Sequence, residues 1–227
     1  MMSKRVTVIT GASGVLGQAL ADAALARGDA VAAVDFGPVA REDGDDWLGL
    51  GGVDLTDPAA AQAAVDAAAQ RFGRIDHLLN AVGGFVWQTT DGPLEGWNRM
   101  RRMNLTTVLN ACRAALPYLL QSPAGRIVNV GALGALAAGA GMGAYAASKA
   151  GVHRLTEALA EETRASSLTV NAVLPSVIDT PANRADMADA DFSRWVQPSE
   201  LATVMLFLAS DAASAVTGAL LPVKGRT

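Results

Sequence analysis

The feature that most constrains the fold is a strand, a glycine turn and a helix near the start of the chain. Residues 6–10 are rich in β-formers, and the turn after them reads G-A-S-G-V-L-G over residues 11–17. Apolar residues then recur at helical spacing until Gly28. Glycines let main-chain N–H groups approach a phosphate, and a helix N-terminus adds a positive dipole. This order of elements predicts a dinucleotide site.

The alternation of strand and helix continues to the end of the chain. We expect strands over residues 30–34, 76–82, 126–132, 168–174 and 220–223, and a short third strand ending at residues 53–55, after a polar loop or short helix over residues 36–52. Between them, Asp57 and Gly73 are typical of the two ends of a helix. Repeated βα units predict an α/β fold, a single doubly wound Rossmann domain over residues 1–227 with a seven-stranded parallel sheet flanked by helices. A polar segment, residues 181–197, is expected to be mobile and to border the substrate.

Composition excludes several classes of partner. The 227 residues are 51% hydrophobic, which suits one globular domain. A net charge of −4, with no run of Lys or Arg, argues against nucleic acid and anionic membranes. The first apolar run is too short for a signal sequence or a membrane span, so we expect a soluble cytoplasmic protein. Cys112 is the only cysteine, and the two histidines have no partners at ligand spacing, so no metal site is expected.

Asp35 predicts which dinucleotide binds. It ends the second strand, 18 residues after Gly17. A carboxylate at this place accepts hydrogen bonds from the adenosine ribose hydroxyls and repels a 2′-phosphate. We therefore expect NAD(H) to be preferred over NADP(H). Arg41 is the alternative group that could meet a 2′-phosphate, but Asp35 is nearer to the site.

Tyr145 and Lys149 are four residues apart in a segment that reads as a helix from Gly143. This spacing places both side chains on one face, one turn apart. A cation beside a phenol can lower its pKa from about 10 by roughly 1–3 units, towards the range that suits a general acid. The structural alternative is an ordinary polar pair on a helix.

Several motifs together resemble the short-chain dehydrogenase/reductase family: residues 10–17, Asp54-Leu55, N-A-V-G at 80–83, Asn104, Y-x-x-x-K at 145–149, and residues 175–180. The resemblance implies that Tyr145 is the proton donor, that Lys149 bonds the nicotinamide ribose and lowers the Tyr145 pKa, and that Asn104 holds a water of the proton relay. The cofactor residues that it implies are Gly11, Ser13, Gly14, Val15, Leu16, Gly17, Asp35, Phe36, Asp54, Leu55, Asn80, Ala81, Val82, Gly83, Tyr145, Lys149, Pro175, Ile178 and Thr180.

The chain departs from the usual family pattern at two places. Its glycines run G-x-x-G-x-x-G, where short members usually show G-x-x-x-G-x-G, and Ala132 stands 13 residues before Tyr145, where the catalytic Ser usually is. With residues 173–175, 179–184 and 190–193, this Ala resembles the dihydropteridine reductase branch. That branch favours NADH and has an aromatic after Gly-Gly, as Phe85 is here. Asn104 is a difference from it. The expected substrate contacts are Phe85, Trp87, Ala132 and Asn183.

Three hypotheses for function follow. The leading one is an NADH-dependent reductase of a quinonoid dihydropteridine-like ring. The second is a ketone reductase or alcohol dehydrogenase, for example one similar to 3-oxoacyl reductases, in which another donor replaces the Ser. The third is a non-catalytic NAD(H)-binding regulatory protein. A homo-oligomer, dimer or tetramer, is expected in each case.

Overall fold

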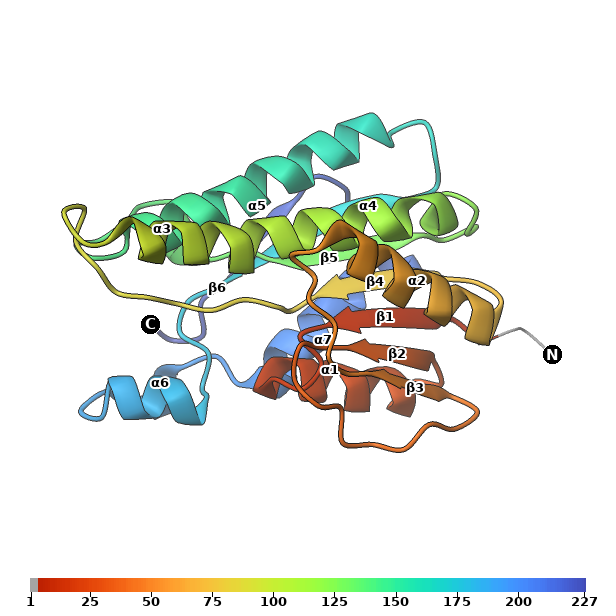
Figure 1. The fold of residues 1–227 in the computed structure, drawn as a ribbon, viewed down its shortest axis with the longest axis horizontal. Helices are drawn as coiled ribbons and strands as arrows, with labels where there is room; N and C mark the ends of the chain where they lie inside the picture. Colours follow the sequence, from red (N-terminus) through yellow and green to blue (C-terminus); the bar gives the residue numbers. More distant parts are fainter. Residues whose placement is uncertain (1–3) are drawn as a thin grey trace.

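A seven-stranded parallel sheet forms the middle layer of the computed structural model, which describes residues 4–227 (Figure 1). The strand order is β3-β2-β1-β4-β5-β6-β7. The strands are β1 (Val6–Thr10), β2 (Ala30–Val34), β3 (Trp47–Leu50), β4 (His77–Asn80), β5 (Arg126–Val130), β6 (Thr169–Pro175) and β7 (Leu220–Val223). The order reverses between β1 and β4, which confirms the predicted doubly wound sheet.

Helices cover both faces of the sheet. They are α1 (Val15–Ala26), α2 (Pro58–Phe72), α3 (Leu94–Met100), α4 (Thr107–Leu119), α5 (Gly143–Glu162), α6 (Pro181–Asp186) and α7 (Pro198–Leu208). Helices α1 and α7 pack together on one face, and α2, α4 and α5 lie on the other (Figure 1). Strands β1, β2, β4, β5 and β6 are buried along their whole length, as expected for a parallel sheet between two helical layers.

Local signals place several element ends correctly. The Asp57 side chain accepts a hydrogen bond from the Ala59 N–H at 2.9 Å, Pro58 is the first residue of α2, and Gly73 ends the helix with φ 78°. Helix α5 begins at Gly143, and β7 spans the predicted residues 220–223. Capping and glycine stops are local effects, which is why the sequence alone predicts them.

The third strand was predicted wrongly. Strand β3 spans Trp47–Leu50, inside the segment expected to be a loop, and a turn at Gly52 (φ 76°) ends it. Residues 53–55 come after the strand, where the Val53 N–H donates to the Asp35 carbonyl oxygen at 3.0 Å. A four-residue edge strand containing glycine shows too little periodicity to predict, and its pairing with β2 defines it.

The long helix before β5 contains a π-helical turn, η1 (Arg101–Thr106). Here the Thr107 N–H donates to Arg102 O, five residues back. The predicted helix is therefore present, but the sequence did not predict the extra residue in this turn. Such turns are rare and often occur at functional sites.

The segment 181–197 is folded. It contains α6 and a 3₁₀ turn, Phe192–Arg194, and an isolated bridge between Ile178 and Val196 joins its end to the residues that follow β6. Its mobility remains a prediction.

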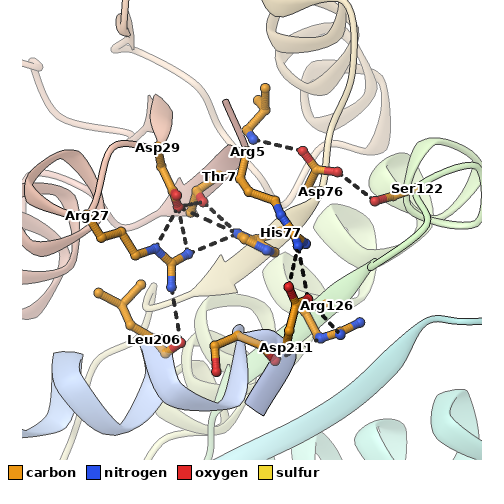
Figure 2. Close-up of polar contacts among 12 residues, drawn as sticks. Arg5, Thr7, Arg27, Asp29, Asp76, His77, Ser122, Arg126, Leu206 and Asp211 are labelled. Atoms are coloured by element: carbon orange, nitrogen blue, oxygen red, sulfur yellow. Dashed lines mark hydrogen bonds and ion pairs between the residues drawn. The ribbon is translucent and has the colours of Figure 1, made fainter. Parts of the chain in front are cut away.

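A buried polar network lies at the N-terminal ends of strands β1, β2 and β4, at the opposite ends of these strands from the glycine turn (Figure 2). Asp29 accepts hydrogen bonds from Thr7 and Arg27, at 2.6 Å each, and His77 lies beside it. Burial acts to raise the pKa of Asp29, but the hydrogen bonds outweigh it and lower the pKa to about 2. Burial lowers the pKa of His77, whose Nε2 has no partner among the described residues.

Within residues 4–227, no helix is both long and apolar enough to cross a membrane.

Candidate active site

The glycine turn after β1 is a cradle at the point where the strand order reverses. Gly11 has φ +70°, and a Cβ there would lie 2.7 Å from the Val82 nitrogen. A Cβ at Gly17 would overlap the Gly11 carbonyl oxygen. Gly14 precedes α1 without a side-chain cap, and no acidic residue lies in the first turn. A cradle that side chains would fill, under an uncapped helix N-terminus, fits the pyrophosphate of a dinucleotide.

A cavity of about 520 Å³ lies between the strand ends and the α3–η1 helices. Its predicted members are Gly11, Asp35, Phe36, Asp54, Leu55, Val82 and Gly83. Asp35 is held at the glycine turn, since its two oxygens accept from the N–H groups of Ser13 and Gly37 at 2.8 Å each. Phe36 is 75% exposed, so its ring is available to a ligand. Sequence reasoning missed the helical wall, which consists of Glu95, Asn98, Arg99, Arg102, Met103 and Thr107.

A second cavity, of about 620 Å³, joins the glycine turn to Tyr145. Its predicted members are Gly11, Gly14, Val15, Leu16, Gly17, Ala81, Gly83, Phe85, Tyr145, Lys149, Pro175, Ile178, Thr180 and Asn183. Sequence reasoning missed Gly84, Val130, Gly131, Ser176, Pro181, Ala182 and Asp186. Three of these, Pro181, Ala182 and Asp186, lie on α6. The segment 181–197 was the available signal, because its place after β6 puts it at this edge.

Tyr145 and Lys149 both face the second cavity from α5. The Phe85 ring lies edge-on to the Tyr145 ring, with centroids 5.1 Å apart. Lys149 is buried and its ammonium donates to the Val130 carbonyl oxygen at 2.7 Å. Burial lowers the pKa of Lys149 to about 8. The predicted helical pair is therefore present, with a half-buried phenol and a buried amine.

The predicted effect of Lys149 on Tyr145 is absent. Burial raises the pKa of Tyr145 to about 12, instead of the expected fall towards neutrality. Lys149 is itself desolvated, and its ammonium donates to Val130 at the end of β5. Desolvation of the phenol is the cause of the higher pKa of Tyr145, and Lys149 does not oppose it.

The Asn104 side chain is not exposed to the cavity. It is buried in η1, where Oδ1 accepts from the Gly84 N–H at 2.9 Å and Nδ2 donates to Gly84 O at 3.1 Å and to Ser148 Oγ at 2.9 Å. Ser148 Oγ in turn donates to Tyr145 O at 2.7 Å. These bonds make Asn104 a brace between the turn after β4 and helix α5. That Asn104 also holds a water of the proton relay stays a prediction.

Ala132 also lies outside the cavity lining. It is 3% exposed, and its N–H donates to His153 Nε2 at 3.2 Å. Gly131 makes this approach possible, because a Cβ there would lie 2.5 Å from the same nitrogen. Burial, with Arg154 and Lys149 nearby, lowers the pKa of His153. The pattern of the sequence held no signal for this contact, which joins the end of β5 to the second half of α5.

Asn80 and Trp87 were also predicted as site residues, but they lie outside both cavities. The buried Asn80 side chain accepts from Thr10 Oγ1 at 3.0 Å and donates to Asn129 Oδ1 at 2.9 Å, so it bonds three neighbouring strands together. The Trp87 ring packs on Gly141, where a Cβ would overlap it. Neither residue lines the two cavities. Among the cofactor residues, Ser13 lines a smaller adjoining pocket, near Arg41.

Comparison with known proteins decides the family. A family model described as enoyl-(acyl carrier protein) reductase matches residues 11–225. The chain belongs to the short-chain dehydrogenase/reductase family. It is therefore similar over nearly its whole length to enzymes, and it is an oxidoreductase with a nucleotide-binding Rossmann fold.

The family relatives match almost end to end. The 3-oxoacyl-[acyl-carrier-protein] reductase FabG of Salmonella typhimurium is 31% identical and is matched over 97% of this chain and 96% of its own length. The 2-(R)-hydroxypropyl-CoM dehydrogenase of Xanthobacter autotrophicus is 33% identical, over 97% of each chain. Among solved structures, the 3-ketoacyl-(acyl-carrier-protein) reductase from Brucella melitensis complexed with NADH has a TM-score of 0.89 and 30% identity, with 99% of this chain and 98% of that chain covered. The branch within the family stays a prediction.

Proposed function

We propose that this protein is an NADH-dependent reductase of a conjugated, quinonoid dihydropteridine-like substrate, with Tyr145 as the proton donor. The observation that carries the proposal is the environment of Ala132. The position has no hydroxyl, and its N–H is bonded to His153. Neither group is therefore available to a negative charge that develops on a substrate oxygen.

This absence discriminates between substrate classes. Reduction of a simple ketone develops charge on one oxygen, and loss of one preorganised donor to such an oxyanion typically costs ~10²–10³ in rate. In a quinonoid ring the developing charge is spread over several heteroatoms. One missing hydroxyl then costs little, so the site suits a conjugated acceptor better than a ketone.

Asp35 and Arg41 support NADH over NADPH. The Asp35 carboxylate is fixed at the glycine turn by two main-chain N–H groups. Arg41 is committed elsewhere, because it pairs with Asp22 at 3.0 Å and stacks over the Trp47 ring at 4.7 Å. A 2′-phosphate would therefore meet a carboxylate without this compensating cation. The Brucella melitensis relative is complexed with NADH, which is consistent with this preference.

The side chains of the second cavity have distinct roles in this proposal. Bound NADH supplies the hydride. Tyr145, whose pKa of about 12 keeps the phenol protonated at neutral pH, holds the proton for the substrate. Lys149 binds the nicotinamide ribose, and Ile178 and Thr180 meet the carboxamide. Asn104 positions the Gly84 turn and α5 through its side-chain bonds.

The variant Ala132→Ser tests the proposal. We expect it to change turnover of quinonoid dihydropterin by no more than a few-fold and to raise any ketone activity by ~10-fold or more. The measurement is kcat/KM for both substrate types in the wild type and the variant, at saturating NADH. Fast ketone reduction by the wild type, without pterin activity, would refute the proposal.

The second candidate is a ketone reductase or alcohol dehydrogenase, and the names of the relatives favour it. The Salmonella typhimurium relative is a 3-oxoacyl reductase, and the Xanthobacter autotrophicus relative is a dehydrogenase. The same kinetic comparison decides between the candidates. The non-catalytic alternative is less well supported, since Tyr145 and Lys149 both reach the cavity. Assembly into a dimer or tetramer remains a prediction, which light scattering would test. Cytoplasmic localisation also remains a prediction, which cell fractionation would test.

A further inference from the structure

Helix α6 closes one side of the second cavity. Thr180, Pro181, Ala182, Asn183 and Asp186 contribute to the lining. In Figure 1, α6 lies below the strand ends and α5, which carries Tyr145, lies above them. A ligand that reaches Tyr145 in this cavity therefore has α6 on its other side.

Asn183 lines this cavity, and its side-chain nitrogen is already bonded within the protein. Its Nδ2 donates to the Ile178 carbonyl oxygen at 2.7 Å, and its main-chain N–H donates to Thr180 Oγ1 at 3.2 Å. No group within residues 4–227 donates to Oδ1. Because the amide nitrogen is held by Ile178, the atom left for a ligand is the acceptor.

Asp186 adds a second acceptor one turn further along α6. Its carboxylate makes no hydrogen bond or ion pair with any other described residue, and it lines the same cavity. Lys149 is the only cationic residue in that lining, and its ammonium is bonded to Val130. The α6 side thus offers two free acceptors to a ligand.

An ion pair holds α6 in this orientation. The Arg184 guanidinium donates to both carboxylate oxygens of Asp179, at 2.5 and 2.7 Å, and stacks over the Phe192 ring at 4.8 Å. Gln197 also donates to Asp179, at 3.0 Å. Asp179 comes directly after Ile178, and Arg184 comes directly after Asn183. The pair therefore connects the helix that carries both acceptors to the end of β6 and to residues 192–197.

We propose that Asn183 and Asp186 form an acceptor wall that selects planar heterocycles with N–H donors on the edge away from Tyr145, and that the Asp179–Arg184 pair positions this wall. The inference rests on the proposed function, since it names the ring chemistry that the same site recognises. Amino and ring N–H groups of a heterocycle would donate to the two oxygens, whereas a ring edge of carbonyls alone would be repelled. Asn183 and Asp186 are then specificity residues, and Arg184 is a positioning residue.

The test uses unreactive ligands, so that it does not depend on turnover. The protein with saturating NAD⁺ is titrated by fluorescence with 2-amino-4-oxopteridine and with its 2-dimethylamino analogue, which cannot donate from that nitrogen. We expect the wild type to bind the amino compound at least ~10-fold more tightly, since a donor paired with a charged acceptor is lost in the analogue. Asp186→Asn and Asn183→Ala should each reduce this ratio to about 3-fold or less.

Matched variants separate recognition from general damage. Asp189→Asn removes the same charge from an exposed residue outside the cavity and should keep the wild-type ratio. Arg184→Gln should lower the ratio without changing NADH affinity, and Arg184→Lys should restore part of it. The inference is overturned if the wild type does not discriminate, if Asp186→Asn keeps the full ratio, or if the variants alter NADH affinity instead. Selective binding without reduction of quinonoid dihydropterin would refute only the proposed function.

Discussion

The pKa of Lys149 leads to a quantitative prediction for the pH dependence of activity. Burial lowers this pKa from 10.5 to about 8, so the ammonium form is lost as pH rises through 8. If only the ammonium can bind the nicotinamide ribose, kcat/KM for NADH should fall by no more than about 1.3-fold from pH 6.5 to 7.5 and decrease steeply above pH 8. The profile of kcat/KM reports the groups of the free enzyme, which is the state that the structure describes.

The expected size follows from the pKa. At pH 10, two pH units above a pKa of about 8, about 1% of the amine is protonated, so kcat/KM should fall ~100-fold between pH 7 and pH 10. Tyr145 does not contribute a limb in this range, because burial raises its pKa to about 12. The limb should therefore have the slope of a single group.

The assay is NADH oxidation with the pterin substrate at saturation, from pH 6.5 to 10, with circular dichroism at each pH to confirm that the protein remains folded. Lys149→Met is the matched variant, and it should be slow at pH 7 and lack the alkaline limb. A wild-type profile that stays flat to pH 10 would refute the reasoning. It would mean that the bond to Val130 O stabilises the ammonium more than burial destabilises it.

Three further predictions concern single side chains. Tyr145→Phe keeps the ring and removes the proton, so turnover should fall ~10²–10⁴ with little change in NADH affinity; near-normal turnover would disprove the role. NADH should bind at least ~10-fold more tightly than NADPH, about 1.4 kcal/mol, and Asp35→Ala should narrow the gap in fluorescence titrations; equal affinities in the wild type would contradict this. Asp29 has a pKa of about 2 against an ordinary 3.8, so its stabilisation is present above pH 3.8 and is lost as pH falls towards 2. In urea unfolding, Asp29→Asn should therefore cost about 2 kcal/mol at neutral pH and remove that acid dependence, and an unchanged unfolding free energy would count against the network.

The sequence by itself determined the order of strands and helices, the glycine cradle, the place of Asp35 and the pairing of Tyr145 with Lys149. These features depend on local patterns: β-rich runs, helical periodicity, caps and turns. Two elements were exceptions. Strand β3 is short and contains glycine, and the π-helical turn at Arg101–Thr106 adds one residue to a helix whose apolar pattern does not reveal it.

Only the tertiary structure decided what the side chains at the site can do. Asn104 is occupied by Gly84 and Ser148, and the Ala132 N–H is occupied by His153, residues 20 to 44 positions away. The same holds for the pKa of Tyr145, which burial raises although a cation lies one turn away. Hydrogen-bond partners and desolvation depend on which distant segments meet, and the spacing of residues along the chain does not contain that information.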